Sequence, residues 1–131
     1  MAFSRVALTD EDGLRDIYAS VADETLEVEI PIPAAGQARG FPKYLEAVSI
    51  LADATNYSHD VFFYRKCGET GKEEPIDYLD FSVAANQKTS GSLSFDEGER
   101  WKFRPGDSLV IKGSVDTHAG QQVVVDWTTH S

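Results

Sequence analysis

Alternation of apolar and polar residues is the main pattern along this chain. It is cleanest over residues 26–32, LEVEIPI, where four apolar side chains alternate with Glu27 and Glu29. A period of two predicts a strand with one buried face and one solvated face. Pro31 cannot donate a ladder hydrogen bond, so we expect this strand to lie at a sheet edge or to end there.

Further short strands follow, separated by segments rich in Gly, Pro and polar residues. They are predicted at residues 44–52, 60–65, 78–83, 93–95, 101–103, 108–113 and 122–127. The connections at 33–42, 53–59, 68–75 and 84–92 are long, which favours a Greek-key or jelly-roll path. The sequence Arg104-Pro105-Gly106-Asp107 predicts a tight turn.

Two segments also fit a helix. Over residues 8–22, apolar side chains recur at helical spacing after a capping-like pair, Thr9 and Asp12, so we expect a short amphipathic helix, with a strand as the alternative. Residues 44–52 could continue a helix begun at Pro42. We prefer a strand there, because residues 60–65 can pair with it as a hairpin.

These elements predict a mainly β, single-domain sandwich over residues 1–131. It would be jelly-roll-like, with about eight short strands and one or two short helices, and residues 1–25 would form an N-terminal arm or short helix. A chain of this length buries enough surface to fold without disulfides or metals. The predicted core residues are Val28, Ile30, Phe62, Phe81, Leu109, Ile111 and Val124.

Charge and composition narrow the classes of partner. The chain has 22 acidic and 12 basic residues, a formal net charge of −10, which disfavours nucleic acid and anionic membranes as partners. The N-terminus has no signal-like apolar run, and no stretch reaches the length of a membrane span. We therefore expect synthesis in the cytoplasm without a signal peptide. The single cysteine, Cys67, excludes an internal disulfide.

The residues that could carry chemistry are few and scattered. The three histidines, His59, His118 and His130, have no metal-ligand spacing. His59-Asp60 and Asp116-Thr117-His118 place a carboxylate near an imidazole, but both lie in predicted loops, where polar residues are common. Phosphate-loop, dinucleotide and nucleophile-elbow motifs are absent from the sequence. We expect no catalytic residue, no metal and no cofactor.

One basic segment is the best candidate for contact with a partner. In a strand over residues 100–104, Trp101 and Phe103 would share the core-facing side, and Arg100, Lys102 and Arg104 would share the other. Such a cationic strip could be a solvated face or could dock on an acidic partner, including another copy of this chain. Phe41 and Tyr57, in predicted loops, would add apolar contact.

The final third places a polar turn, an aromatic strand, a Pro-Gly-Asp turn and an apolar strand in succession over residues 94–112. With the strand-rich middle, this resembles the small β-sandwich accessory proteins of tailed-phage virions, such as head decoration proteins and small tail or neck components. The resemblance covers residues 26–127 in general style. It implies a structural, non-enzymatic role as a homo-oligomer, such as a trimer, on a larger capsid or tail assembly.

Two other functions fit the same pattern. A carbohydrate-binding sandwich would need exposed aromatic side chains, for which the candidates are Tyr57, Tyr64, Tyr78, Trp101 and Trp127. A small enzyme on a β scaffold would use Asp116 and His118. The absence of catalytic motifs and the strand count favour the virion structural protein.

Overall fold

The computed structural model describes residues 8–9, 14–19, 24–52, 57–83, 89–117 and 121–129. Within these ranges the chain forms ten strands and no helix. It follows that the described part has no helix long and apolar enough to cross a membrane.

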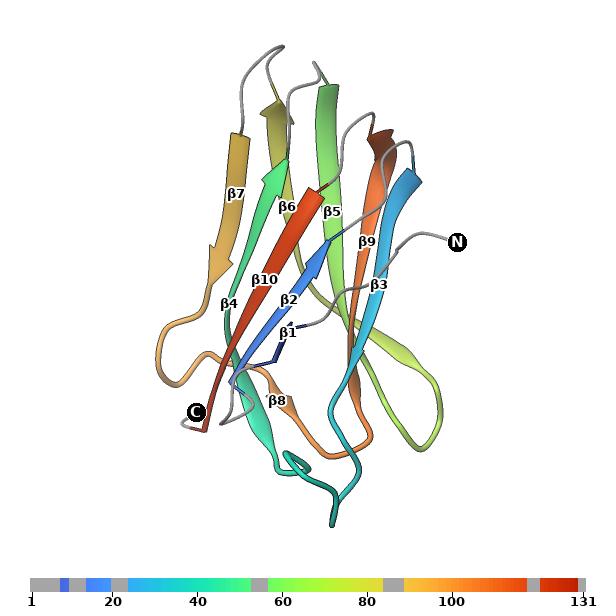
Figure 1. Cartoon of the computed structure of the whole chain (residues 1–131), viewed down its shortest axis with the longest axis vertical. Coiled ribbons are helices and arrows are strands. Elements are labelled where there is room, and N and C mark those ends of the chain that lie inside the picture. The colour runs from blue at the N-terminus through green and yellow to red at the C-terminus, as the bar shows by residue number, and fades with distance from the viewer. Residues whose placement is uncertain are drawn as a thin grey trace.

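Two antiparallel sheets pack face to face (Figure 1). Sheet A has the order β1-β2-β10-β4-β7, and β8 also pairs with β4. Its strands are β1 (Leu8–Thr9), β2 (Arg15–Ala19), β4 (Lys43–Ala52), β7 (Thr89–Ser94), β8 (Lys102–Phe103) and β10 (Gln121–Thr128). Sheet B has the order β3-β9-β5-β6. Its strands are β3 (Glu24–Pro31), β5 (Tyr57–Lys66), β6 (Glu73–Val83) and β9 (Ser108–Thr117).

The strand order is that of a jelly roll. Without β1 and β8, the two sheets read β2-β10-β4-β7 and β3-β9-β5-β6, and the chain changes sheet at every connection except β5–β6. This is the double-sheet arrangement that the long connections favoured. The prediction of a mainly β, jelly-roll-like sandwich is confirmed.

One cluster of buried apolar side chains fills the space between the sheets. Of the predicted core residues, Val28, Ile30, Leu109 and Ile111 belong to this cluster. Phe62 does not, because Val61 and Phe63 on either side of it point inward. Val124 is only half-buried for the same reason, since its neighbours Val123 and Val125 take the core positions. The side chain of Phe81 lies outside the described residues.

The expected helix over residues 8–22 is wrong in the part that the structure describes. Residues 15–19 form β2, which pairs antiparallel with β10 along its whole length, and Leu8 and Thr9 pair with β2 in turn. The backbone N–H of Trp127 donates to the carbonyl oxygen of Leu14 at 2.8 Å. A long-range ladder thus outweighs the local helical spacing, and the N-terminal segment contributes to sheet A.

The expected hairpin between residues 44–52 and 60–65 is also wrong, although both segments are strands. β4 lies in sheet A between β10 and β7, whereas β5 lies in sheet B between β9 and β6. Each is an inner strand, with both neighbours supplied by other parts of the chain. The predicted loops at 68–75 and 84–92 are shorter than expected, because β6 begins at Glu73 and β7 at Thr89.

Two local predictions are confirmed in detail. β3 is an edge strand of sheet B and ends at Pro31, with Glu27 and Glu29 exposed. Residues 104–107 form a turn in which the N–H of Asp107 donates to the carbonyl oxygen of Arg104 at 2.9 Å. Gly106 occupies the left-handed region of that turn, with φ of 93°.

Candidate functional site

The outer face of sheet B carries two large aromatic side chains in solvent. Phe62 on β5 and Tyr78 on β6 are cross-strand partners, with ring centroids 6.3 Å apart and ring planes inclined at 32°. Phe62 is 39% exposed and Tyr78 is 60% exposed. We call them the outer aromatic pair. Adjacent exposed rings are a common feature of binding surfaces, because contact with a partner removes their apolar area from water.

Local backbone geometry sets this exposure. Val61 and Phe63 are buried, so the alternation of β5 turns Phe62 outward. On β6 the register shifts at Ile76, an extra residue between the partners of Phe63 and Tyr64. Ile76 packs against the core, and the bulge sets the register that places Tyr78 opposite Phe62.

Charged side chains flank the outer aromatic pair. Lys112 on β9 is the register partner of Phe62 on the side away from Tyr78. Its Nζ lies 2.8 Å from Oε1 of Glu73 and 5.1 Å from the ring centroid of Tyr64. The hydrogen bond to Glu73 holds the pKa of Lys112 above its usual value.

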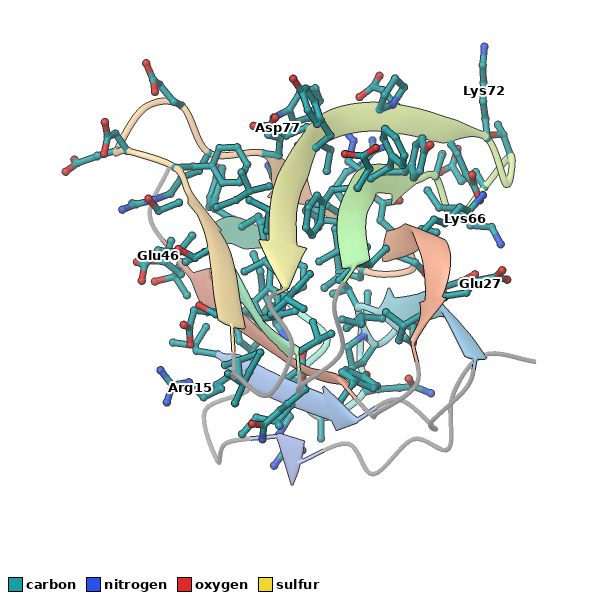
Figure 2. All side chains as sticks on the ribbon, turned by 90° about the horizontal axis from the view of Figure 1, so that it is seen from above. Arg15, Glu27, Glu46, Lys66, Lys72 and Asp77 are labelled. Carbon is teal, nitrogen blue, oxygen red and sulfur yellow. The ribbon has the colours of Figure 1, made fainter. Side chains whose placement is uncertain are left out.

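The surroundings of this face are mainly acidic. Figure 2 shows Asp77, Glu27 and Lys66 standing out from the ribbon on this side of the sandwich. Lys66 Nζ lies 3.1 Å from Oε1 of Glu29, so this cation is already paired with an acid. An apolar centre with a charged rim suits reversible binding of a protein surface or a sugar.

A second feature is a cleft of about 400 Å³ at one end of the sandwich, between the β5–β6 loop and the β8–β9 turn. It is lined by Arg65, Cys67, Thr70, Lys72, Glu73, Glu74, Pro75, Arg104 and Asp107. Several lining charges pair within the molecule: Arg65 with Glu74, and Arg104 with Asp107 at 3.6 Å. Asp107 also accepts hydrogen bonds from the N–H groups of Gly68 and Arg104, both at 3.0 Å. These contacts hold two loops together.

Cys67 lies in this cleft, and its thiol is more acidic than usual. Hydrogen bonding from the backbone N–H of Thr70, then from the Thr70 hydroxyl and the N–H of Glu69, lowers the pKa of Cys67. The described residues that line the cleft include no histidine, and the side chains of all three histidines lie outside the described part of the chain. Across the described residues, no group of three or more His, Cys, Asp and Glu side chains could hold a metal ion.

The predicted cationic strip is not one exposed surface. Arg100 precedes β8, its side chain is 15% exposed, and its guanidinium donates to the carbonyl oxygen of Phe95 at 3.2 Å and lies 3.7 Å from Glu46. It therefore holds the loop before β8 rather than facing a partner. Lys102 and Arg104 are exposed, and Arg104 is paired with Asp107. The expected arrangement assumed a regular strand over residues 100–104, but β8 contains only residues 102 and 103.

The other predicted contact residues lie elsewhere. Phe41 is half-buried, and the Nζ of Lys43 lies 4.9 Å from its ring centroid, so the ring partly covers a buried cation. Tyr57 begins β5, where its backbone pairs with Val83, and its side chain lies outside the described residues. The structure does not bring these residues and the basic segment together into one described site.

Of the aromatic residues considered for sugar binding, some lie in or against the core and others lie on the outer face of sheet B. Trp127 is buried, with its indole N–H donating to Asp16 Oδ2 at 2.9 Å and its ring edge-to-face with Phe103. Trp101 packs against the core beneath the guanidinium of Arg65. Tyr64 and Tyr78 remain on the outer face of sheet B.

The structure describes only some of the residues that were considered for an enzyme site. His59 lies in β5, not in a loop as expected, and its side chain lies outside the described residues. His118 and His130 fall outside the described residues entirely, and Asp116 is placed only by the backbone of β9.

Sequence reasoning missed the outer aromatic pair because Val61-Phe62-Phe63-Tyr64 is a continuous apolar run. Such a run has no alternation that would tell which side faces water. Glu27 and Glu29 did mark the solvated face of β3 in the sequence. Which side chains of other strands share that face depends on the strand order of sheet B, which the sequence pattern does not show.

No family model and no curated protein matches this chain. Solved structures do match, among them these three. An Eiger TNF from S. frugiperda is 10% identical over 86% of this chain and 91% of that one, with a TM-score of 0.48. Murine APRIL is 14% identical over 84% and 97%, with a TM-score of 0.43. The CBM22-1–GH10 modules of Clostridium thermocellum xylanase 10B, complexed with xylohexaose, are 12% identical over 100% and 30%, with a TM-score of 0.36. Scores this low say nothing about the function of this chain.

Proposed function

We propose that this chain is a non-enzymatic structural protein of a virion, a capsid decoration or tail component that binds a protein lattice. The observation that carries the proposal is the outer aromatic pair, Phe62 and Tyr78, exposed on one face of a jelly-roll sandwich. Jelly rolls serve repeatedly in capsid proteins, and exposed aromatic side chains are frequent anchors of protein interfaces.

The charge around the outer aromatic pair indicates what charge the lattice surface should carry. Glu27, Glu29, Asp77 and Glu73 are exposed on or beside sheet B. Glu29 pairs with Lys66 and Glu73 with Lys112, which leaves Glu27 and Asp77 as the acidic excess. A complementary lattice surface would therefore be basic around an apolar depression. Charge of this kind mainly sets orientation and association rate, and the aromatic rings supply affinity.

The test is capture and direct rebinding. Tagged wild-type protein is mixed with disrupted particles from the native source, bound proteins are identified by mass spectrometry, and the purified partner is rebound. We expect a capsid or tail protein, and at least tenfold weaker rebinding by Phe62→Ser/Tyr78→Ser. Leu51→Ser, which alters an exposed apolar residue of sheet A, is the matched control and should bind normally. Failure of the wild type to bind any particle protein would overturn the proposal.

A carbohydrate-binding module is the second candidate, favoured by the 60% exposure of Tyr78. An exposed ring can stack on a sugar, and Asp77 and Asp60 could accept hydrogen bonds from its hydroxyls. Binding of the wild type to a glycan array, lost in Tyr78→Ala and retained in Leu51→Ser, would favour this function. A chain that binds no glycan but captures a particle protein would exclude it.

A further inference from the structure

The four sheet edges of this sandwich differ in how they are protected. In sheet B, β3 carries Glu27, Glu29 and Pro31, and β6 carries Pro75, Asp77 and a bulge. In sheet A, β1 is only two residues long. The other edge of sheet A is shared by β8, which carries Lys102, and β7, whose sequence TSGSLS contains no charge and no proline. Acidic residues, prolines, bulges and short length are the usual means of preventing edge-to-edge pairing, and β7 has none of them.

The pairing of β7 with β4 is regular. Its six residues pair without a register shift, as those of β5 and β9 do, whereas the β10–β4, β3–β9 and β5–β6 ladders each contain one. A straight, unbulged edge presents its backbone groups at even spacing, as an added strand requires. Figure 1 shows β7 at one side of the molecule, where it ends the strand order of sheet A.

The direction of the backbone groups follows from one hydrogen bond. The N–H of Phe95 donates to the carbonyl oxygen of Glu46 at 2.9 Å, which continues the β4–β7 register beyond Ser94. Because backbone groups of an antiparallel strand point alternately to its two sides, Leu93 and Gly91 also face β4. The N–H and C=O groups of Ser90, Ser92 and Ser94 therefore point away from β4. Among the described residues, no strand pairs with this side of β7.

We propose that this edge pairs with β7 of a second copy of the chain. In an antiparallel pairing about a two-fold axis, Ser92 lies opposite Ser92 of the second copy, and Ser90 opposite Ser94. Each of these pairs can exchange two backbone hydrogen bonds, and the two A sheets become one continuous sheet. The outward side chains of Ser92 and Ser94 are small, while Leu93 packs against the core of its own copy.

β7 itself brings no charge to self-association, and the acids Asp96, Glu97 and Glu99 lie in the turn that follows it. Two copies with a net charge of −10 each repel one another, so contact is least unfavourable where the meeting strands are uncharged. β3–β3 or β6–β6 contact would instead bring like charges face to face. Added salt should therefore strengthen association through β7, because it screens the repulsion between copies.

The proposal goes beyond lattice binding, because β7 lies in the other sheet from the outer aromatic pair. Its test is sedimentation velocity of the purified chain over a range of concentrations, at low and moderate salt. The wild type should reach twice the monomer mass, more readily at moderate salt. Ser92→Pro removes an N–H that faces away from β4, and should stay monomeric with an unchanged circular dichroism spectrum. Ser92→Ala keeps that N–H and is the matched control, expected to dimerise as the wild type does.

Ser92→Lys adds a charge to the edge and keeps the backbone N–H. It should also stay monomeric, and it replaces Ser92→Pro in the test if the proline variant does not fold. A monomeric wild type at all concentrations, or dimers of both Ser92→Lys and a folded Ser92→Pro, would overturn the proposal. Phe62→Ser/Tyr78→Ser should still dimerise. If the wild type binds its lattice as a monomer, the pairing through β7 is wrong and the proposed function stands.

Discussion

Gly68 and Gly106 lie backbone against backbone, so close that a Cβ at Gly68 would be 2.2 Å from the carbonyl oxygen of Gly106. The contact joins the β5–β6 loop to the β8–β9 turn. Asp107 reinforces it by accepting the N–H of Gly68. Loops from both sheets are thus joined at the end of the sandwich.

Gly68→Ala should destabilise the protein. The added methyl group overlaps main-chain atoms that cannot rotate away, so we expect a loss of about 1–3 kcal/mol in the free energy of unfolding. Urea denaturation followed by tryptophan fluorescence measures it. Glu69→Ala, an exposed neighbour, should change stability by no more than about 0.5 kcal/mol. Equal effects of the two variants would show that the close contact is not maintained in solution.

Asp107 should make the free energy of unfolding fall at acidic pH. Its burial raises the pKa of the carboxyl, but the N–H groups of Gly68 and Arg104 and the Arg104 guanidinium outweigh this, and the net pKa is lowered. An acid with a depressed pKa in the folded state stabilises above its unfolded pKa of about 4, and this is lost as pH falls through the folded pKa. Asp107→Asn should therefore cost about 1.5–3 kcal/mol at pH 7.

The difference in unfolding free energy between wild type and Asp107→Asn should shrink as pH falls below about 4. Chemical denaturation of both proteins at several pH values between 7 and 3 gives this difference directly, with the other carboxyl groups common to both. A constant difference down to pH 3 would contradict the assigned hydrogen bonds.

Phe62 and Phe63 offer a matched comparison of the two faces of β5. Phe63 is 1% exposed and Phe62 is 39% exposed. Phe63→Ala should cost about 3–5 kcal/mol, because it removes a large core side chain. Phe62→Ala should cost much less, since it leaves no internal cavity. Thermal or urea unfolding of the two variants tests the assignment, and a larger loss for Phe62→Ala would mean that β5 is turned the other way.

Lys43 is a buried cation and should make stability depend on alkaline pH. Burial lowers its pKa, Asp16 opposes this, and Arg39 adds to it. Between the folded and unfolded pKa values, the unfolded chain binds more protons, so Lys43 makes stability rise with pH. Urea denaturation measured at several pH values from 7 to 10 should show that the wild type becomes more stable relative to Lys43→Met as pH rises. A constant difference over that range would mean that Lys43 has an ordinary pKa in the folded protein.

The candidate binding face could be predicted only in part. Glu27 and Glu29 marked the solvated side of β3 from their alternation alone. Tyr78 was a candidate as an aromatic residue that could be exposed. That Phe62 joins it depends on the order β3-β9-β5-β6 and on the bulge at Ile76, neither of which leaves a local pattern. The basic segment does not form one exposed strip, because Arg100 contacts Phe95 and Glu46, and the position of Glu46 depends on the pairing of β4.

The sequence by itself determined the local conformation: the strand at 26–32, the turn at residues 104–107, most strand positions and the β class. These depend on side-chain period, proline and glycine, which act within a few residues. Only the tertiary structure decided that β4 and β5 lie in different sheets and that residues 15–19 join β10. Strand pairing depends on hydrogen bonds between segments far apart in the chain, and a strand accepts any partner that satisfies its backbone and buries its apolar face.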